Sequence, residues 1–185
     1  MQTKQDSEKT PFCFCPRCGR QALVPHEVKA YRCTECGFEF YLNVAAAVAG
    51  FILDAEGRLL VTVRGKDPGK GTLDLPGGFI DPHENAEQAI RREIKEELNL
   101  DVTETIYLFS SPNQYPYMNV TYHTMDLGYL CKVNNFRALK LADEIAEYQF
   151  VDPSQLKTDF FGFPSIRQMI RLFQYGSRHR ESMIR

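Results

Sequence analysis

Two glutamates near the middle of the chain have the residue type and spacing of metal ligands. Residues 78–100 read GFIDPHENAEQAIRREIKEELNL, and a helix turns by about 100° per residue. On such a helix Glu93 and Glu97 lie one turn apart within an apolar face, and Glu96 borders it. That face is formed by Ala86, Ala89, Ile90, Ile94 and Leu98. Because burying unpaired carboxylates is costly, the pattern predicts a divalent cation with oxygen ligands at this place.

The whole segment resembles the Nudix box, the hydrolase motif G-x5-E-x7-R-E-U-x-E-E-x-G-U, where U is a bulky aliphatic residue. The fixed positions are occupied by Gly78, Glu84, Arg92, Glu93, Ile94, Glu96, Glu97 and Leu100. Asn99 stands where the motif has glycine, just past the helix end, and Asn tolerates the left-handed conformation wanted there. The alternative is an amphipathic helix laced with Arg and Glu pairs, which leaves the inward acids unexplained.

The resemblance implies roles for these side chains. It implies catalytic Mg²⁺ or Mn²⁺ bound by Glu93, Glu96 and Glu97, with Glu147, just before a strand at residues 148–151, as an additional ligand. Glu96 could bind metal or accept the proton of the attacking water, and we expect Arg92 to hold a glutamate in place. Glu84 would support the site, although an acid in a first helical turn also has a purely structural reason. The bend at Gly77 and Gly78 could turn a carbonyl, that of Gly78, toward a metal.

Four of the six cysteines form two C-x2-C pairs, Cys15 with Cys18 and Cys33 with Cys36. Each pair can offer two thiolates to one tetrahedral ion, which is typical of a zinc ribbon with a short hairpin between the pairs. Four thiolates leave no open position, so the zinc would be structural. A disulfide framework is the alternative. Cys13 could compete with Cys15 as a ligand, although Cys15 gives two equivalent turns.

Length and composition set limits on the rest of the protein. The chain has 185 residues, of which 43% are hydrophobic, and a formal net charge of -2. This suffices for one sizeable core and a small appendage, and bulk charge gives no argument for nucleic-acid or membrane binding. We expect a zinc ribbon at residues 1–42, with residues 1–10 disordered, and a catalytic domain at 43–185. The polar N-terminal stretch and the short apolar runs predict a cytoplasmic protein without membrane spans.

The pattern after residue 42 predicts strands and helices in one α/β domain. Residues 43–53 and 58–64 are β-rich, and the intervening DAEG turn suggests a hairpin. Strands are expected at residues 106–110, 121–133 and 148–151, and a helix at 164–175. The Nudix resemblance implies an α/β/α sandwich, in α+β terms a mixed sheet between helices, which agrees with this order.

Two loops are candidates for substrate binding. The glycine-rich loop at residues 65–71 carries Lys66 and Lys70, which could approach a phosphate or could simply be solvated. Residues 110–119, SSPNQYPYMN, are expected to form a loop in which Tyr115 and Tyr117 offer faces for stacking a base. The same tyrosines could equally pack the loop.

A zinc ribbon followed by this box resembles the NADH pyrophosphatase branch of the Nudix hydrolases, whose members also remove NAD caps from RNA. The implied reaction is hydrolysis of the pyrophosphate bond in a nucleoside diphosphate linked to another moiety, such as NADH, NAD or ADP-ribose, by a homodimer. Members acting on NADH carry S-Q-P-W-P-F-P-x-S after the box, whereas this chain has no tryptophan. The alternatives are a nucleotide-sanitising triphosphate pyrophosphohydrolase and a nucleotide-sensing regulatory or binding module whose ribbon contacts a partner.

Overall fold

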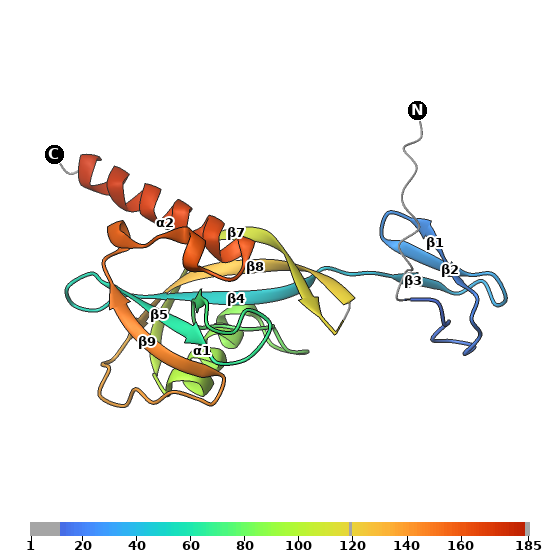
Figure 1. Cartoon of the computed structure of the whole chain (residues 1–185), viewed down its shortest axis with the longest axis horizontal. Coiled ribbons are helices and arrows are strands. Elements are labelled where there is room, and N and C mark those ends of the chain that lie inside the picture. The colour runs from blue at the N-terminus through green and yellow to red at the C-terminus, as the bar shows by residue number, and fades with distance from the viewer. Residues whose placement is uncertain (1–11, 119, 184–185) are drawn as a thin grey trace. The chain divides into compact units, whose positions relative to one another are not determined.

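The computed structural model describes residues 12–118 and 120–183, and of residues 177–183 the backbone alone (Figure 1). The expected disorder of residues 1–10 lies outside the described residues. The chain forms two compact units, residues 1–44 and 45–185. The division lies two residues after the boundary expected at residue 42. No helix in the described part of the chain is long and apolar enough to cross a membrane.

The N-terminal unit is a three-stranded antiparallel sheet. Its strands are β1 (Leu23–Glu27), β2 (Ala30–Cys33) and β3 (Glu39–Tyr41), in the order β1-β2-β3. The expected hairpin between the two C-x2-C pairs is therefore confirmed. In the described part of this unit the buried residues are Cys15, Leu23, Ala30 and Cys33, with partly buried aromatic rings packed against the cluster of Cys15, Leu23 and Cys33. A core of this size needs an additional cross-link to be stable.

The second unit has the mixed α+β architecture that the sequence predicts. Its elements are β4 (Ala45–Ile52), β5 (Leu59–Arg64), β6 (Leu73–Asp74), α1 (Ala86–Leu98), β7 (Val102–Tyr117), β8 (Val120–Val133), β9 (Ile145–Val151), the short helical turns η1 (Pro153–Gln155) and η2 (Thr158–Phe160), and α2 (Pro164–Met183). One sheet has the order β4-β8-β7, with β4 parallel to β8; the other has the antiparallel order β6-β5-β9.

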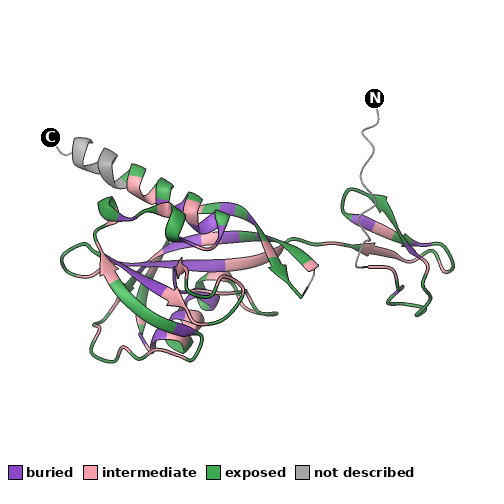
Figure 2. Ribbon diagram, viewed as in Figure 1, coloured by how far each residue is buried: buried purple, intermediate pink, exposed green. Residues whose placement is uncertain are grey.

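The central strands divide their side chains between two cores. On β4, Val48 and Ile52 pack with the residues of α1, whereas Ala49 and Phe51 pack with those of α2. Figure 1 shows the two helices on opposite sides of these strands, and Figure 2 shows the burial along β4. Because successive strand residues point to opposite faces, a strand covered on both sides is apolar throughout. This arrangement is the expected α/β/α sandwich.

The predicted hairpin of residues 43–53 with 58–64 is wrong. The turn is present, with Gly57 N–H donating to the Asp54 carbonyl at 3.1 Å, but the two strands share only an isolated bridge between Leu53 and Leu59. Instead β4 pairs with β8, and β5 pairs with β6 and β9. β4 lies at the edge of the β4-β8-β7 sheet and β5 in the middle of the β6-β5-β9 sheet, so the two strands belong to different sheets.

The predicted loop at residues 110–119 is also wrong, because β7 continues through it to Tyr117. Pro112 and Pro116 stand opposite Met125 and Thr121 of β8. β7 is an edge strand of its sheet, and an edge strand accepts proline where no ladder hydrogen bond is needed. The tyrosines expected in a loop therefore lie on a strand.

Helix α1 begins at Ala86, two residues after the start expected at Glu84. Asn85 caps it, because its side chain accepts from Gln88 N–H while the Gln88 side chain accepts from Asn85 N–H. At the other end Asn99 has φ 56 and ψ 30, the left-handed conformation expected where the motif has glycine. Its side-chain amide also donates to the Ala138 carbonyl at 2.9 Å, so Asn fixes the chain beyond the helix as well as ending it.

The C-cap gives a first testable expectation. Asn99→Ala should lower the free energy of unfolding by about 1–2 kcal/mol, because alanine tolerates the left-handed conformation poorly and loses the bond to Ala138. Asn99→Gly keeps the conformation and should cost less. Urea denaturation measures both, with the exposed Glu104→Ala as the control. Equal losses for Ala and Gly would show that backbone conformation is not the cause.

Candidate active site and metal centre

Arg92 is the centre of a network of carboxylates on and beside α1. Its guanidinium donates to Glu84 Oε2 at 3.1 Å, to Glu93 Oε1 at 2.8 Å and to Glu96 Oε2 at 3.1 Å. It also donates to the Phe79 carbonyl at 3.0 Å. These bonds raise the pKa of Arg92, and the one to Glu84 contributes most. The sequence expectation that Arg92 holds a glutamate in place agrees with this geometry.

Glu97 is partly buried and has no cationic partner among the contacts of the described residues. Burial is the main cause that raises the pKa of Glu97 to about 8, and the charges of Glu93, Asp74 and Glu144 add to it. The hydrogen bond from Gly77 N–H to Glu97 Oε2, at 2.9 Å, opposes the shift. Glu97 therefore lies in a partly desolvated place under the influence of other negative charges, which is an environment suited to a cation.

The inward positions read from the helix pattern are found in the structure. The Glu93 side chain is 15% exposed, whereas that of Glu96, at the border of the face, is 58% exposed. Burial is the main cause that raises the pKa of Glu93, although Arg92 opposes it. Arg92 lies among Glu84, Glu93 and Glu96, so in the described residues these carboxylates do not converge as tightly as the four cysteine sulfurs do.

A cavity of about 220 Å³ opens beside Glu97. Residues of β4, β5, β6, β7 and β8, the loop after β6 and the start of α2 enclose it. Its polar lining consists of Thr62, Arg64, Asp74, Glu97, Asn113, Thr124, Asp126 and Glu144, and its aromatic lining of Phe79, Tyr115 and Phe163. The metal-type carboxylate and a ligand-sized space therefore share one site.

The predicted substrate residues divide between the cavity and the surface. Tyr115 lines the cavity and stacks on Phe163, with ring centroids 5.5 Å apart. Tyr117 is 47% exposed and does not line it. Lys70 is exposed and also lies outside the lining, whereas Lys66 Nζ is 3.6 Å from Glu144 Oε2. Of the two loop lysines, Lys66 is the one beside the site.

The family resemblance implied Glu147 as the additional metal ligand, but Glu144 is the acid of this segment that lines the cavity. Glu147 is exposed on β9, opposite Val63 of β5, and does not line the cavity. Glu144 immediately precedes β9, and its backbone carbonyl accepts from Gly65 N–H at 2.7 Å. Both acids belong to one DEIAE run and both are exposed, the Glu144 side chain to 50%, but of the two only Glu144 lines the cavity.

The carbonyl proposed to face a metal, that of Gly78, accepts a hydrogen bond from Val48 N–H at 2.8 Å. Space is tight on the other side as well, because a Cβ at Gly78 would lie 2.5 Å from Glu93 Oε1. Gly78 therefore lets the loop approach both β4 and α1.

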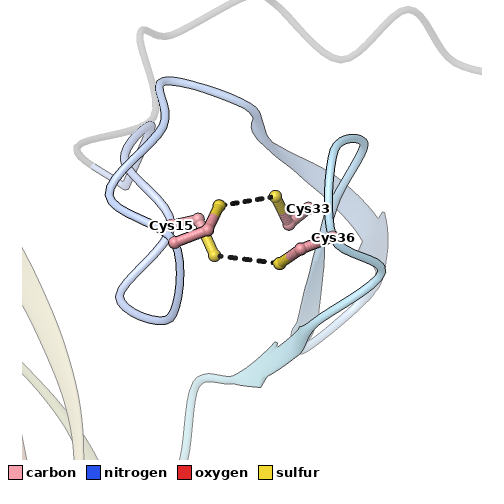
Figure 3. A group of neighbouring side chains, drawn as sticks. Cys15, Cys33 and Cys36 are labelled. Atoms are coloured by element: carbon pink, nitrogen blue, oxygen red, sulfur yellow. Dashed lines mark hydrogen bonds between the residues drawn. The ribbon is translucent and has the colours of Figure 1, made fainter.

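Four cysteines of the N-terminal unit form the second candidate metal centre. The sulfurs of Cys15, Cys18, Cys33 and Cys36 all lie within 4.8 Å of one another. Two of the approaches, between Cys15 and Cys36 and between Cys18 and Cys33, are 3.7 Å, and Figure 3 shows Cys15, Cys33 and Cys36 with their side chains turned toward one another. A tetrahedral zinc with Zn–S bonds of about 2.3 Å has sulfur–sulfur edges of roughly 3.8 Å. Burial raises the pKa of Cys15, but backbone hydrogen bonds from Cys18 and Arg17 outweigh it and lower the pKa to about 7, which favours a thiolate.

Comparison with known proteins gives consistent matches. The model of the NUDIX domain matches residues 44–173. An ADP-ribose pyrophosphatase of Methanocaldococcus jannaschii is 32% identical over 145 residues, which cover 77% of this chain and 78% of that protein. The NAD-capped RNA hydrolase NudC of Deinococcus radiodurans is 28% identical over 77% of this chain and 50% of its own length. This chain thus spans about half the length of that NudC relative.

Solved structures agree on the fold. The crystal structure of a NUDIX hydrolase from Nitrosomonas europaea has a TM-score of 0.67 and 21% sequence identity, and the match covers 91% of this chain and 93% of that one. At this identity the likeness concerns the fold alone.

The raised pKa of Glu97 predicts how the stability of the protein depends on pH. Glu97 has a pKa of about 8 in the folded protein against an ordinary value of 4.5, so the folded state binds this proton more tightly. Its contribution to the stability of the metal-free protein is full below pH 4.5 and is lost as the pH rises through about 8.

Glu97→Gln should therefore be more stable than the parent protein by a few kcal/mol above pH 8 and similar to it near pH 4.5. Urea denaturation in EDTA across this range tests the prediction, with Glu56→Gln on the exposed turn as the control. A stability difference that is the same at every pH would contradict it.

Proposed function

The chain belongs to the Nudix hydrolase family, and we propose that it uses divalent metal ions to hydrolyse the pyrophosphate bond of a nucleoside diphosphate linked to another group. The observation that carries the proposal is the partly buried Glu97, which has a raised pKa and lines the cavity. The relative at 32% identity is named an ADP-ribose pyrophosphatase, and further relatives are named NAD-capped RNA hydrolases. We therefore propose ADP-ribose and NADH or NAD as the first substrates to test, followed by NAD-capped RNA.

Glutamates and one arginine on and near α1 would bind and position the metal ions. We propose that Glu93, Glu96, Glu97 and Glu144 hold Mg²⁺ or Mn²⁺, with Glu144 in place of Glu147. When bound, such ions polarise phosphate oxygens and lower the pKa of a bound water. Arg92 positions Glu93 and Glu96 and links them to Glu84, which accepts from Asp81 N–H at 2.7 Å. Glu96, the most exposed of these acids, could also accept the proton of the water.

The main test is a product-resolved screen with Mg²⁺ and with Mn²⁺. ADP-ribose, NADH, NAD, sugar nucleotides and NAD-capped RNA are offered together with nucleoside triphosphates. Hydrolysis of ADP-ribose should give AMP and ribose 5-phosphate, and NADH should give AMP and a mononucleotide. Release of pyrophosphate from triphosphates alone would favour a nucleotide-sanitising enzyme. Binding of nucleotide without turnover of any compound would favour a sensor module.

Variants connect turnover with the carboxylates. Glu97→Gln should lower kcat by at least about 100-fold, because an amide binds hard cations poorly and cannot accept a proton. Glu144→Gln should reduce activity more than Glu147→Gln if Glu144 is the additional ligand. Glu56→Gln serves as the control. Unchanged turnover by Glu97→Gln, or turnover unaffected by EDTA, contradicts the proposed chemistry.

We propose that Cys15, Cys18, Cys33 and Cys36 hold a structural zinc, as the fit of their sulfurs to a tetrahedron suggests. Reduced cysteines of this kind also suit the cytoplasmic location that the sequence predicts. Cys33→Ser should lose the zinc and destabilise the N-terminal unit, whereas Cys13→Ser should keep one zinc per chain. Elemental analysis of the purified protein measures both. Loss of zinc from Cys13→Ser would mean that Cys13 is a ligand. Homodimer formation stays a prediction, which analytical ultracentrifugation can check.

A further inference from the structure

One corner of the cavity contains a buried acceptor that the fold leaves unused. Asn113 lies on β7, is 8% exposed and lines the cavity. Among the described residues, no hydrogen-bond donor reaches its side-chain oxygen Oδ1. Buried polar groups in folded proteins are nearly always paired, and leaving one unpaired lowers stability. An orphaned acceptor in a ligand-sized cavity therefore indicates a donor that arrives with the ligand.

The neighbouring strand adds a second acceptor to the same corner. Asn113 stands opposite Thr124 in the β7–β8 pairing, and Ser111 stands opposite Asp126. Cross-strand partners and residues two apart share one face of a sheet, so these side chains project together. Asp126 is buried and held by two hydroxyls, with Thr124 Oγ1 at 2.6 Å from one oxygen and Ser165 Oγ at 2.5 Å from the other. Each carboxylate oxygen can accept more than one bond, so Asp126 is fixed in place and still able to accept.

The positive charge of Arg64, near this corner, is already paired with other groups of the protein. Arg64 is the only cation among the described residues that line the cavity. It donates to Asp74 Oδ2 and to the Pro68 carbonyl, both at 2.7 Å, and lies 4.9 Å from the centre of the Phe163 ring. Burial raises the pKa of Asp74, and the charge of Asp126 contributes in the same direction. The corner therefore disfavours anions, and its unused acceptor Asn113 Oδ1 favours groups that donate.

Size and shape limit the ligand part that fits. Tyr115 and Phe163 form a stacked pair, and Phe79 meets Tyr115 edge to face at 5.5 Å. The cavity of about 220 Å³ is below the roughly 300–1,000 Å³ that is typical for a whole ligand. It suits one planar ring beside aromatic walls, with the rest of a dinucleotide extending toward the carboxylates of α1.

We propose that Asn113 and Asp126 bind the amino or amide N–H group of one ring of the substrate, and so select an amino-bearing ring over its oxo or acid counterpart. Two rings of the proposed substrates carry such a group, the adenine with its exocyclic amine and the nicotinamide with its carboxamide. The inference rests on the proposed function for the identity of the ligand. It names the group that gives specificity, which is separate from the metal carboxylates that break the bond.

Binding measurements test this without requiring turnover. Calorimetric titration in EDTA compares AMP with IMP, and nicotinamide mononucleotide with nicotinic acid mononucleotide. IMP has an oxo group in place of the exocyclic amine and a proton on the ring nitrogen beside it, and the acid has a carboxylate in place of the carboxamide. We expect the amino or amide member of one pair to bind at least about tenfold more tightly, because a site built around hydrogen bonds rejects the analogue that lacks them. The pair that shows the difference identifies the ring.

Matched variants assign the effect to the corner. Asn113→Leu keeps the approximate shape but removes the acceptor, and the ratio of dissociation constants within the pair should fall to about threefold or less. Gln114→Leu changes the adjacent amide, which is exposed on the opposite face of β7, and should leave the ratio unchanged. Circular dichroism checks folding, and Asn113→Ala carries the same expectation if the leucine variant does not fold.

Several outcomes would overturn the assignment. These are equal binding within both pairs, preference for the oxo or acid member, discrimination that survives in Asn113→Leu, and no binding of any of the four compounds at millimolar concentration. The proposed function is judged separately. A preference for the amino member without turnover of any diphosphate substrate would reject the reaction and keep the corner, whereas turnover without such a preference would do the reverse.

Discussion

The site depends on one guanidinium among acids. Arg92 contacts Glu84, Glu93 and Glu96 and the carbonyl of Phe79, so it ties the loop before α1 to the helix itself. Without this charge, the acids would repel one another in a partly buried place and the loop would lose its anchor. Among the contacts of the described residues, Arg92 does not bond to Glu97, and burial keeps the pKa of that acid high. The network therefore orders Glu84, Glu93 and Glu96 and leaves Glu97 available.

The loop that closes the site over α1 lies on β4 through backbone contacts that only glycine permits. Gly77 has φ 149, and a Cβ there would lie 2.0 Å from the Val48 carbonyl oxygen. Val48 N–H donates to the Gly78 carbonyl, and Gly50 N–H donates to the Pro76 carbonyl, both at 2.8 Å. This close approach positions the Gly77 N–H to donate to Glu97. β4, which contributes side chains to both cores, therefore also fixes the loop that lies between the cavity and α1.

The errors in the predicted fold share one physical cause. Periodicity shows which residues are buried, but it does not show which strands pair. The apolar runs of β4 and β5 suggested a hairpin, whereas β4 pairs with β8, and β5 pairs with β6 and β9 in a separate sheet. The prolines of residues 110–119 suggested a loop, whereas an edge strand tolerates them. In both cases the deciding fact is the position of a strand within a sheet, which no local pattern contains.

The sequence by itself determined what depends on short-range spacing. It located α1, its inward acids, the left-handed Asn99 and the cysteine cluster, because helical period and C-x2-C turns are local geometry. Tertiary structure decided what depends on strand partners far apart in the chain. It selected Glu144 rather than Glu147 for the cavity and brought Asn113 to Asp126. An acid within an apolar run, as in TMDLGYL, was the available signal for Asp126, but its meaning required knowing that β7 and β8 face the same space.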